Sequence, residues 1–156
     1  MEKILFRPAT EKDAAQLAGL RALMQCEVNG VEAKTVTPQY RKDLVIYFRE
    51  ALLKNEIYCA VAEIEGKLIA ANGLVLYRKP PSMNGKVGLN GYVSNVYTLP
   101  EYRGRGIAQK LMQLLVDYAR ESGARLLHLG ATSAGKAVYE RVGFKDPEYV
   151  PLELRF

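Results

Sequence analysis

Helical and strand-like spacings of apolar residues alternate along this chain. Three segments repeat apolar residues every three or four positions, which is the spacing of one face of a helix. They begin after a predicted N-cap at Thr10, at Pro38 and at Ile107, and the third ends at Gly123. A shorter helix is predicted over residues 133–142. We therefore expect four helices, and the one that begins at Ile107 has the clearest apolar stripe.

Runs typical of β-strands lie between these helices. We expect strands over residues 3–8, 57–64, 67–77, 92–99 and 125–129 (the last of a buried type), with more strand at 144 and 149–156. The pair Glu65-Gly66 predicts a tight hairpin, and residues 78–91, rich in Gly, Asn and Pro, predict a loop. The order β-α-α-β-β-β-α-β-α-β indicates an α+β fold, with helices interleaved into a mixed sheet, in a single domain over residues 1–156.

Composition narrows the class of protein. The 156 residues are 49% hydrophobic and 25% charged, as in a globular domain, and we expect a cytoplasmic protein with no signal peptide and no membrane span. Cys26 and Cys59 are far apart and His128 is the only histidine, so we expect neither a disulfide framework nor a metal site. His128 lies within an apolar strand and is expected to be a hydrogen-bonded core or edge residue. The net charge of +5 suits an anionic ligand but is too mild to favour nucleic acid.

The most informative segment joins a predicted strand to the strongest helix. The strand ends at Pro100, and residues 103–108 (Arg-Gly-Arg-Gly-Ile-Ala) form a Gly-rich turn at the helix N-terminus. Unpaired backbone N–H groups in such a turn, with the helix dipole, form an anion site. Gly104 and Gly106 allow a ligand to approach the backbone closely. On the residues alone, phosphate binding and a plain connector with two solvated arginines are equally open.

Two nucleotide-binding motifs fit the chain poorly. A dinucleotide-binding Gly-x-Gly-x-x-Gly needs glycine where Gln109 stands, and it needs an acidic residue about 20 positions later, where residues 126–129 offer none. Residues 130–137 (Gly-Ala-Thr-Ser-Ala-Gly-Lys-Ala) nearly spell a phosphate-binding P-loop. Ala137, however, replaces the Ser or Thr that would hold Mg²⁺. Neither motif is favoured.

Two motifs together resemble the GNAT superfamily of N-acetyltransferases. Residues 103–108 resemble its Arg/Gln-x-x-Gly-x-Gly/Ala signature, and residues 97–102 (Tyr-Thr-Leu-Pro-Glu-Tyr) are similar to the strand that leads into it. Residues 139–144 (Tyr-Glu-Arg-Val-Gly-Phe) resemble the family's Tyr-x-x-x-Gly-Phe ending. The likeness is specific over residues 92–145. It implies a central mixed, twisted sheet with a splayed pair of parallel strands, flanked by about four helices.

The resemblance implies acetyl-CoA as a cosubstrate. In this family acetyl-CoA lies between the two splayed strands, here residues 92–99 and 125–129, and its pantetheine arm pairs with one of them like an added strand. The turn would hold the pyrophosphate, and the start of the helix over 133–142 would contact the rest. The cofactor-binding residues implied in this way are Val96, Tyr97, Thr98, Arg103, Gly104, Arg105, Gly106, Ile107, Ala108, Thr132, Ser133 and Lys136.

The resemblance also implies a reaction. A neutral primary amine, of a small metabolite or of a peptide or protein, would attack the thioester directly. Backbone N–H groups near Val96 and Tyr97 would stabilise the oxyanion. Tyr139 occupies the position of the family's general acid, which protonates the departing CoA thiolate. The alternative role of Tyr139 is core packing on an apolar helix.

The general base is left open. Many relatives in the family carry a Glu on the strand before the turn, but residues 92–98 include no carboxylate. A water held by Ser94 or Asn95 would remove the amine proton, or Glu27 or Glu32 would reach in from the preceding connection. An amine with a lowered pKa would need no strong base.

Two other functions stay open. A non-catalytic acyl-CoA-binding sensor is mildly favoured by the missing carboxylate, while Tyr139 argues against it. An enzyme that acts on charged tRNA is suggested only by the net charge. The motifs do not define the acceptor pocket, which Tyr40, Tyr47, Tyr77 or Tyr92 would line unless they pack within the fold. Dimers are frequent in the family, so the resemblance allows a homodimer.

Overall fold

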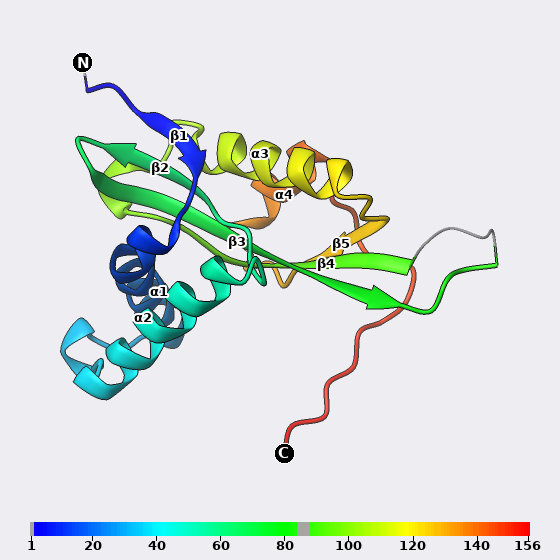
Figure 1. Cartoon of the computed structure of the whole chain (residues 1–156), viewed down its shortest axis with the longest axis horizontal. Helices are drawn as coiled ribbons and strands as arrows, with labels where there is room; N and C mark the ends of the chain where they lie inside the picture. The colour runs from blue at the N-terminus through cyan, green and yellow to red at the C-terminus, as the bar shows by residue number, and fades with distance from the viewer. Residues whose placement is uncertain (1, 84–87) are drawn as a thin grey trace.

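A mixed sheet lies between two layers of helices (Figure 1). In the computed structural model, which describes residues 2–83 and 88–156, five strands follow the order β1-β2-β3-β4-β5. Neighbours are antiparallel except for the parallel pair β4–β5. The strands are β1 (Leu5–Pro8), β2 (Ala60–Ile64), β3 (Lys67–Lys79), β4 (Gly88–Thr98) and β5 (Leu126–His128). The helices are α1 (Ala14–Asn29), α2 (Pro38–Leu53), α3 (Ile107–Glu121) and α4 (Lys136–Val142). The expected mixed sheet and interleaved helices are confirmed.

Local signals set the helix ends where the sequence indicates. The backbone N–H of Thr10 donates to the Asp13 carboxylate at 2.8 Å, and a short 3-10 turn precedes α1. The Thr37 hydroxyl accepts from the backbone N–H of Tyr40 at 3.1 Å, which caps α2 with Pro38 in its first turn. Among the described residues, no helix is both long and apolar enough to cross a bilayer.

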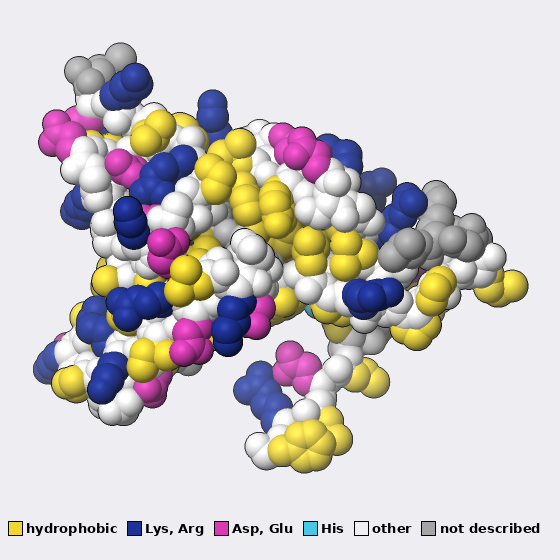
Figure 2. Space-filling view, in the orientation of Figure 1, with side chains coloured by type: hydrophobic (Ala, Val, Ile, Leu, Met, Phe, Trp, Pro, Cys, Tyr) yellow, Lys and Arg dark blue, Asp and Glu magenta, His cyan; other side chains and the backbone are white. Residues whose placement is uncertain are grey.

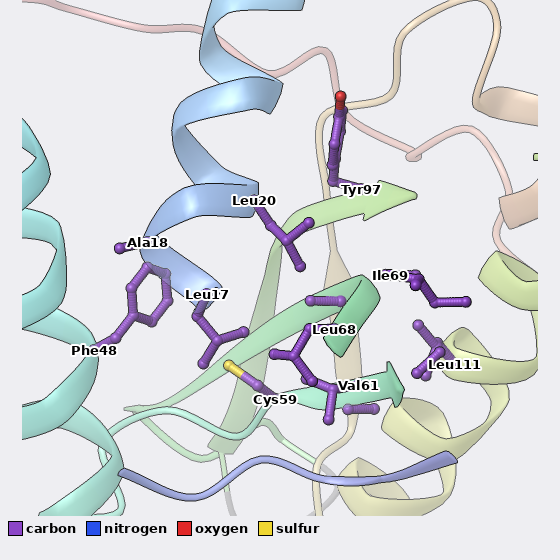
Figure 3. Close-up of a cluster of buried hydrophobic side chains, with 14 of the residues drawn as sticks. Leu17, Ala18, Leu20, Phe48, Cys59, Val61, Leu68, Ile69, Tyr97 and Leu111 are labelled. Atoms are coloured by element: carbon purple, nitrogen blue, oxygen red, sulfur yellow. The ribbon is translucent and has the colours of Figure 1, made fainter. Parts of the chain in front are cut away.

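Two apolar clusters hold the helices on the sheet. The larger one joins α1 and α2 to β2 and β3, and Figure 3 shows Leu17, Phe48 and Cys59 within it. The smaller one joins α3 to β3 and β4 and consists of Leu74, Val93, Met112, Leu115 and Ala119. Burying one such large side chain contributes about 1.5–3 kcal/mol. The two clusters together hold β4 and the start of α3 at fixed positions.

The hairpin is confirmed, but the expected loop is shorter. Glu65 and Gly66 have φ of 47° and 82°, which is the left-handed geometry of a tight hairpin turn. β3 and β4 extend into residues 78–91, as far as the pair Lys79–Gly88. Glycine suits this narrow ribbon, because a Cβ at Gly88 would collide with the carbonyl oxygen of Lys79. Residues 84–87 of the expected loop lie outside the described residues.

Two expectations near the C-terminus are wrong. β5 is not a buried strand, since Leu126 is 53% exposed and only the middle residue is partly covered. Residue 144 and residues 149–156 form no strand. Apolar residues do alternate there, but a strand needs a partner for its backbone groups, and no described segment pairs with it. The exposed apolar residues of this C-terminal tail are Tyr149, Val150, Leu152, Leu154 and Phe156.

Candidate active site

β4 and β5 pair at one end and then separate. β4 pairs with β3 from Gly88 to Thr98, but its described pairs with β5 involve only Asn90, Gly91 and Tyr92. Beyond Tyr92, no described strand lies along the second edge of β4. This edge is therefore available to an extended ligand that pairs like a strand. Val96, Tyr97 and Thr98, the residues expected to pair with a pantetheine arm, lie on this part of β4.

A β-bulge interrupts β4 along the separated part. Ala71 of β3 faces Tyr97, whereas Gly73 faces Ser94, so β4 has an extra residue there. Asn95 in this bulge has φ of 62° and is buried. A bulge leaves backbone groups outside the ladder. Such N–H groups, held rigidly, are suited to stabilise a developing oxyanion.

The turn before α3 presents free backbone amides. Gly104 and Gly106 have φ of 76° and 75°, and a Cβ at either would meet no atom within 4 Å. The N–H groups of residues 104–106 donate to no described residue, and the first amides of α3 have no partner within the helix. Arg103 differs, since its N–H donates to the carbonyl of Pro100 at 3.2 Å. The structure thus brings together an open cluster of donors at the positive end of α3.

The two arginines of the turn contact the protein itself. Arg103 donates from Nε to the carbonyl of Thr98 at 2.9 Å, and from Nη1 and Nη2 to the Glu27 carboxylate at 2.9 and 2.8 Å. This pair lowers the pKa of Glu27, which makes Glu27 a poor general base. Arg105 lies over the ring of Tyr102, 5.3 Å from its centroid, and stays exposed. Arg103 therefore ties the turn to α1 and β4, while Arg105 is accessible to a ligand.

Tyr139 lies half-buried on α4. Its ring packs edge-on to Phe144, with centroids 6.1 Å apart, and it contacts the smaller apolar cluster against which Val96 also packs. Burial raises the pKa of Tyr139 above its ordinary value of 10.0. No described residue is hydrogen-bonded to its hydroxyl. The phenol is thus protonated at neutral pH and can donate a proton.

The residues expected at the start of α4 are exposed. The Thr132 hydroxyl accepts from the backbone N–H of Gly135 at 3.3 Å, and Lys136 Nζ lies 3.3 Å from the Asp146 carboxylate. Ser133 is also exposed. An exposed ion pair of this kind contributes little, so Lys136 can exchange it for a ligand.

A pocket of about 380 Å³ adjoins the bulge from the side of α1 and α2. Of the four tyrosines considered from the sequence, Tyr47 and Tyr92 line it. Tyr77 instead is hydrogen-bonded through its hydroxyl to Nε2 of His128 at 2.7 Å, which confirms the expected hydrogen-bonded edge histidine. The pocket's lining residues are Arg21, Leu44, Tyr47, Phe48, Ile57, Val75, Tyr92, Ser94 and Asn95.

Arg21 is the polar pocket residue that the sequence did not indicate. Its Nη1 donates to Oδ1 of Asn95 at 3.0 Å, so α1 contacts the bulge directly. No local pattern marks this role, because an arginine at the edge of an apolar helix face usually only packs its stem there. A larger pocket of about 560 Å³, between residues such as Leu52 and Tyr118, includes neither the bulge nor the turn.

Comparison with known proteins identifies the family of this chain. A profile of the Acetyltransferase (GNAT) family matches residues 20–144. Thialysine N-epsilon-acetyltransferase of Bos taurus is 28% identical over 154 residues, which cover 94% of this chain and 86% of the relative.

Solved structures of acetyltransferases are also similar to this chain. A predicted acetyltransferase of Clostridium acetobutylicum, crystallised with acetyl-CoA, is 31% identical, with a TM-score of 0.80 over 97% of this chain and 96% of its own. A GCN5-related N-acetyltransferase of Ralstonia eutropha JMP134 is 25% identical, with a TM-score of 0.81 over 97% of this chain and 99% of its own.

Proposed function

Because the chain belongs to the GNAT acetyltransferase family, we propose that it transfers the acetyl group of acetyl-CoA to a primary amine. The observation that carries this proposal is the continuity of the site. Free amides of residues 104–106 lie at the start of α3, and the open edge of β4 leads from them to the bulge. The pocket reaches the same bulge at Ser94 and Asn95. Cosubstrate and acceptor would therefore meet at one point of β4.

The residues fit acetyl-CoA along this path. The open space beside Gly104 and Gly106 and the donors around it suit a pyrophosphate. Val96, Tyr97 and Thr98 would pair with the pantetheine arm, although the carbonyl of Thr98 already accepts from Arg103. Arg105, Ile107 and Ala108 would contribute at the turn, and Thr132, Ser133 and Lys136 at the start of α4. This assignment rests on position and exposure.

Direct transfer needs a free amine, an oxyanion site and a proton donor. The amine nitrogen bonds to the acetyl carbonyl carbon while N–H groups at the bulge stabilise the oxyanion. The carbon–sulfur bond then breaks, the nitrogen loses a proton, and the CoA sulfur receives one from Tyr139. Tyr139 is the group proposed for this step because it occupies the position of the family's general acid, and its protonated hydroxyl is hydrogen-bonded to no described residue.

The general base is best supported as a water at the bulge. Ser94 and Asn95 line the pocket at the point where the amine would arrive. Glu27 is occupied by Arg103, and Glu32 pairs with Lys34 at 2.6 Å on an exposed surface. Neither carboxylate lines the pocket, so a water held by Ser94 or Asn95 is the simpler proton acceptor.

A small metabolite is the best-supported acceptor. The pocket's volume of about 380 Å³ suits a compact molecule better than a folded protein. Similar proteins are named for small amines, namely thialysine in Bos taurus and glucosamine 6-phosphate in Arabidopsis thaliana. No structural observation favours charged tRNA.

Calorimetric titration with acetyl-CoA, and separately with ATP and NAD⁺, tests the cosubstrate. We expect micromolar binding of acetyl-CoA alone, followed by thiol release when a panel of small amines is added. Absence of acetyl-CoA binding would contradict the proposal, and ATP binding would point instead to residues 130–137. Tight acetyl-CoA binding without thiol release from any amine would identify an acyl-CoA sensor.

We also propose that residues 1–156 form one cytoplasmic domain that assembles as a homodimer. The two free, buried thiols of Cys26 and Cys59 support a reducing compartment. The dimer is supported by the C-terminal tail, which stands clear of the body in Figures 1 and 2 and carries apolar residues that are each at least 80% exposed. Such a surface is typical of an interface.

Light scattering tests the dimer. We expect the full chain to have the mass of two copies, and a variant lacking residues 149–156 to have the mass of one, because the exposed apolar side chains are removed. A variant with Leu152→Asp and Leu154→Asp is the matched control, since it keeps the length of the tail and should also be monomeric. A monomeric full chain, or a dimeric truncated chain, would contradict this proposal.

A further inference from the structure

The pocket beside the β4 bulge is lined by hydrogen-bond donors and by no carboxylate. Its polar residues are Arg21, Tyr47, Tyr92, Ser94 and Asn95, and no described Asp or Glu is among its lining residues. Tyr47, Tyr92 and Ser94 make no side-chain hydrogen bond to any described residue, and neither does the amide nitrogen of Asn95. These groups are available to a ligand. A substrate amine that carries negatively charged or hydrogen-bond-accepting groups would match a pocket of this kind.

Arg21 differs from the arginines that serve the fold. Arg7 pairs with Asp13 at 2.8 Å, and Arg103 pairs with Glu27 at 2.8 Å. In the described part of the chain Arg21 has no carboxylate partner, and its hydrogen bond goes to the neutral Oδ1 of Asn95. A guanidinium has five N–H donors, so most of those on Arg21 are unused. Its half-buried charge is therefore uncompensated at the wall of the pocket.

Arg21 of α1 and Tyr47 of α2 both line the pocket from its helix side. Burial raises the pKa of the Tyr47 hydroxyl, and the nearby Arg21 acts against that rise. Cys59 and Glu56 also raise the pKa of Tyr47, but neither is one of the pocket's lining residues. Arg21 and Tyr47 therefore offer donors from the helices, and Ser94 offers its hydroxyl from β4.

The remaining walls are apolar. Leu44 and Phe48 come from α2, Val75 comes from β3, and Ile57 lies just before β2. They suit an aliphatic or aromatic body, while the volume of about 380 Å³ limits its size. The acceptor that fits all of these walls is compact, apolar along its body and charged at one end.

On the premise of the proposed acetyl transfer, we propose that the acceptor is a small amine that also carries an anionic group, and that Arg21 selects it by binding that group. A carboxylate or a phosphate would meet the guanidinium, as in other arginine–anion pairs, and the apolar body would lie between Phe48 and Val75.

Matched pairs of acceptors test this selection in the unmodified protein. Phenylalanine and phenethylamine differ by a carboxylate, and phosphoethanolamine and ethanolamine differ by a phosphate. We expect kcat/KM, measured by thiol release, to favour the anionic member of at least one pair by roughly 10- to 100-fold, the range for a charged hydrogen bond. The pair that shows the preference identifies the anion. Equal kcat/KM within both pairs would overturn the proposal.

Substitution of Arg21 assigns the preference to one side chain. In Arg21→Gln we expect the ratio of kcat/KM within the preferred pair to fall close to one, whatever the change in absolute rate. Arg41→Gln removes an exposed charge on α2, away from the pocket, and should keep the ratio of the unmodified protein. A preference that persists in Arg21→Gln would refute the role of Arg21.

Different results would refute the acetyl transfer and the selection of an anionic amine. Thiol release with neutral amines only would leave acetyl transfer intact and refute the anionic acceptor. Acetyl-CoA binding without thiol release from either pair or from any other amine would refute the transfer itself. Thermal melting of each variant shows whether a lost preference reflects the pocket or the fold.

Discussion

Replacement of Gly106 by alanine separates a cosubstrate role of the turn from its structural role. Gly106 precedes α3 with φ of 75°, and a Cβ there would meet no protein atom within 4 Å. The protein itself therefore has room for the methyl group. The methyl would instead occupy the open space in which we expect a phosphate to accept hydrogen bonds from residues 104–106.

Gly123 provides a control at the opposite end of the same helix. It has φ of 90°, and a Cβ there also meets nothing within 4 Å. A left-handed conformation costs a non-glycine residue about 1 kcal/mol or somewhat more, which lowers the melting temperature by about 2–4 °C in a protein of this size. Gly106→Ala and Gly123→Ala should therefore be destabilised alike.

Affinity for acetyl-CoA should distinguish the two variants. Loss of one hydrogen bond to a charged phosphate costs about 1.5–3 kcal/mol, so we expect Gly106→Ala to bind roughly 10- to 100-fold more weakly by calorimetry. Gly123→Ala should bind like the unmodified protein, because its methyl group lies far along the chain from the turn. If both variants bound acetyl-CoA equally well, the assignment of the pyrophosphate to residues 104–106 would be wrong.

Two further changes test the proton donor and the entry to α1. Tyr139→Phe keeps the ring but removes the hydroxyl, so kcat should fall at least tenfold, within the range of general acid catalysis, with little change in acetyl-CoA affinity. Tyr118→Phe is the control and should keep the kcat of the unmodified protein. If kcat were the same in Tyr139→Phe as in this control, Tyr139 would be only a packing residue. Asp13→Asn weakens the hydrogen bonds from Arg7 at 2.8 and 2.9 Å and should lower the free energy of unfolding at pH 7 by about 1–3 kcal/mol. Because Arg7 lowers the pKa of Asp13 below 3.8, the difference in free energy of unfolding between the unmodified protein and Asp13→Asn should be complete above pH 3.8. It should disappear as the pH falls through the folded-state pKa of Asp13. A difference that does not depend on pH would exclude the ion pair as its cause.

Features that depend on residues adjacent in the sequence were predictable from it. The hairpin at Glu65-Gly66, the start of α2 at Pro38 and the turn before α3 all formed where local patterns indicated them. The position of β4 and the identity of the family followed from motifs within residues 92–145. The assigned roles of Tyr139 and of the turn amides stay predictions.

Other features were predicted incorrectly because they depend on whether a segment distant in the sequence pairs with them or covers them. Residues 149–156 alternate like a strand, yet no described strand pairs with them, and β5 is an exposed edge strand although its sequence is apolar. A pattern of side chains shows how a segment would bury one face. It does not show whether another segment is present to cover that face.

The sequence by itself determined the order of the elements as far as α4, the Gly-rich turn before α3 and the family, because backbone conformation at turns and helix ends depends on residues next to one another. Only the tertiary structure decided that Arg103 ties the turn to Glu27 of α1, and that β4 separates from β5 beyond Tyr92. It also decided that Arg21 meets Asn95 at a pocket without carboxylates. These contacts join residues on separate elements, and packing of α1 against the sheet brings them together.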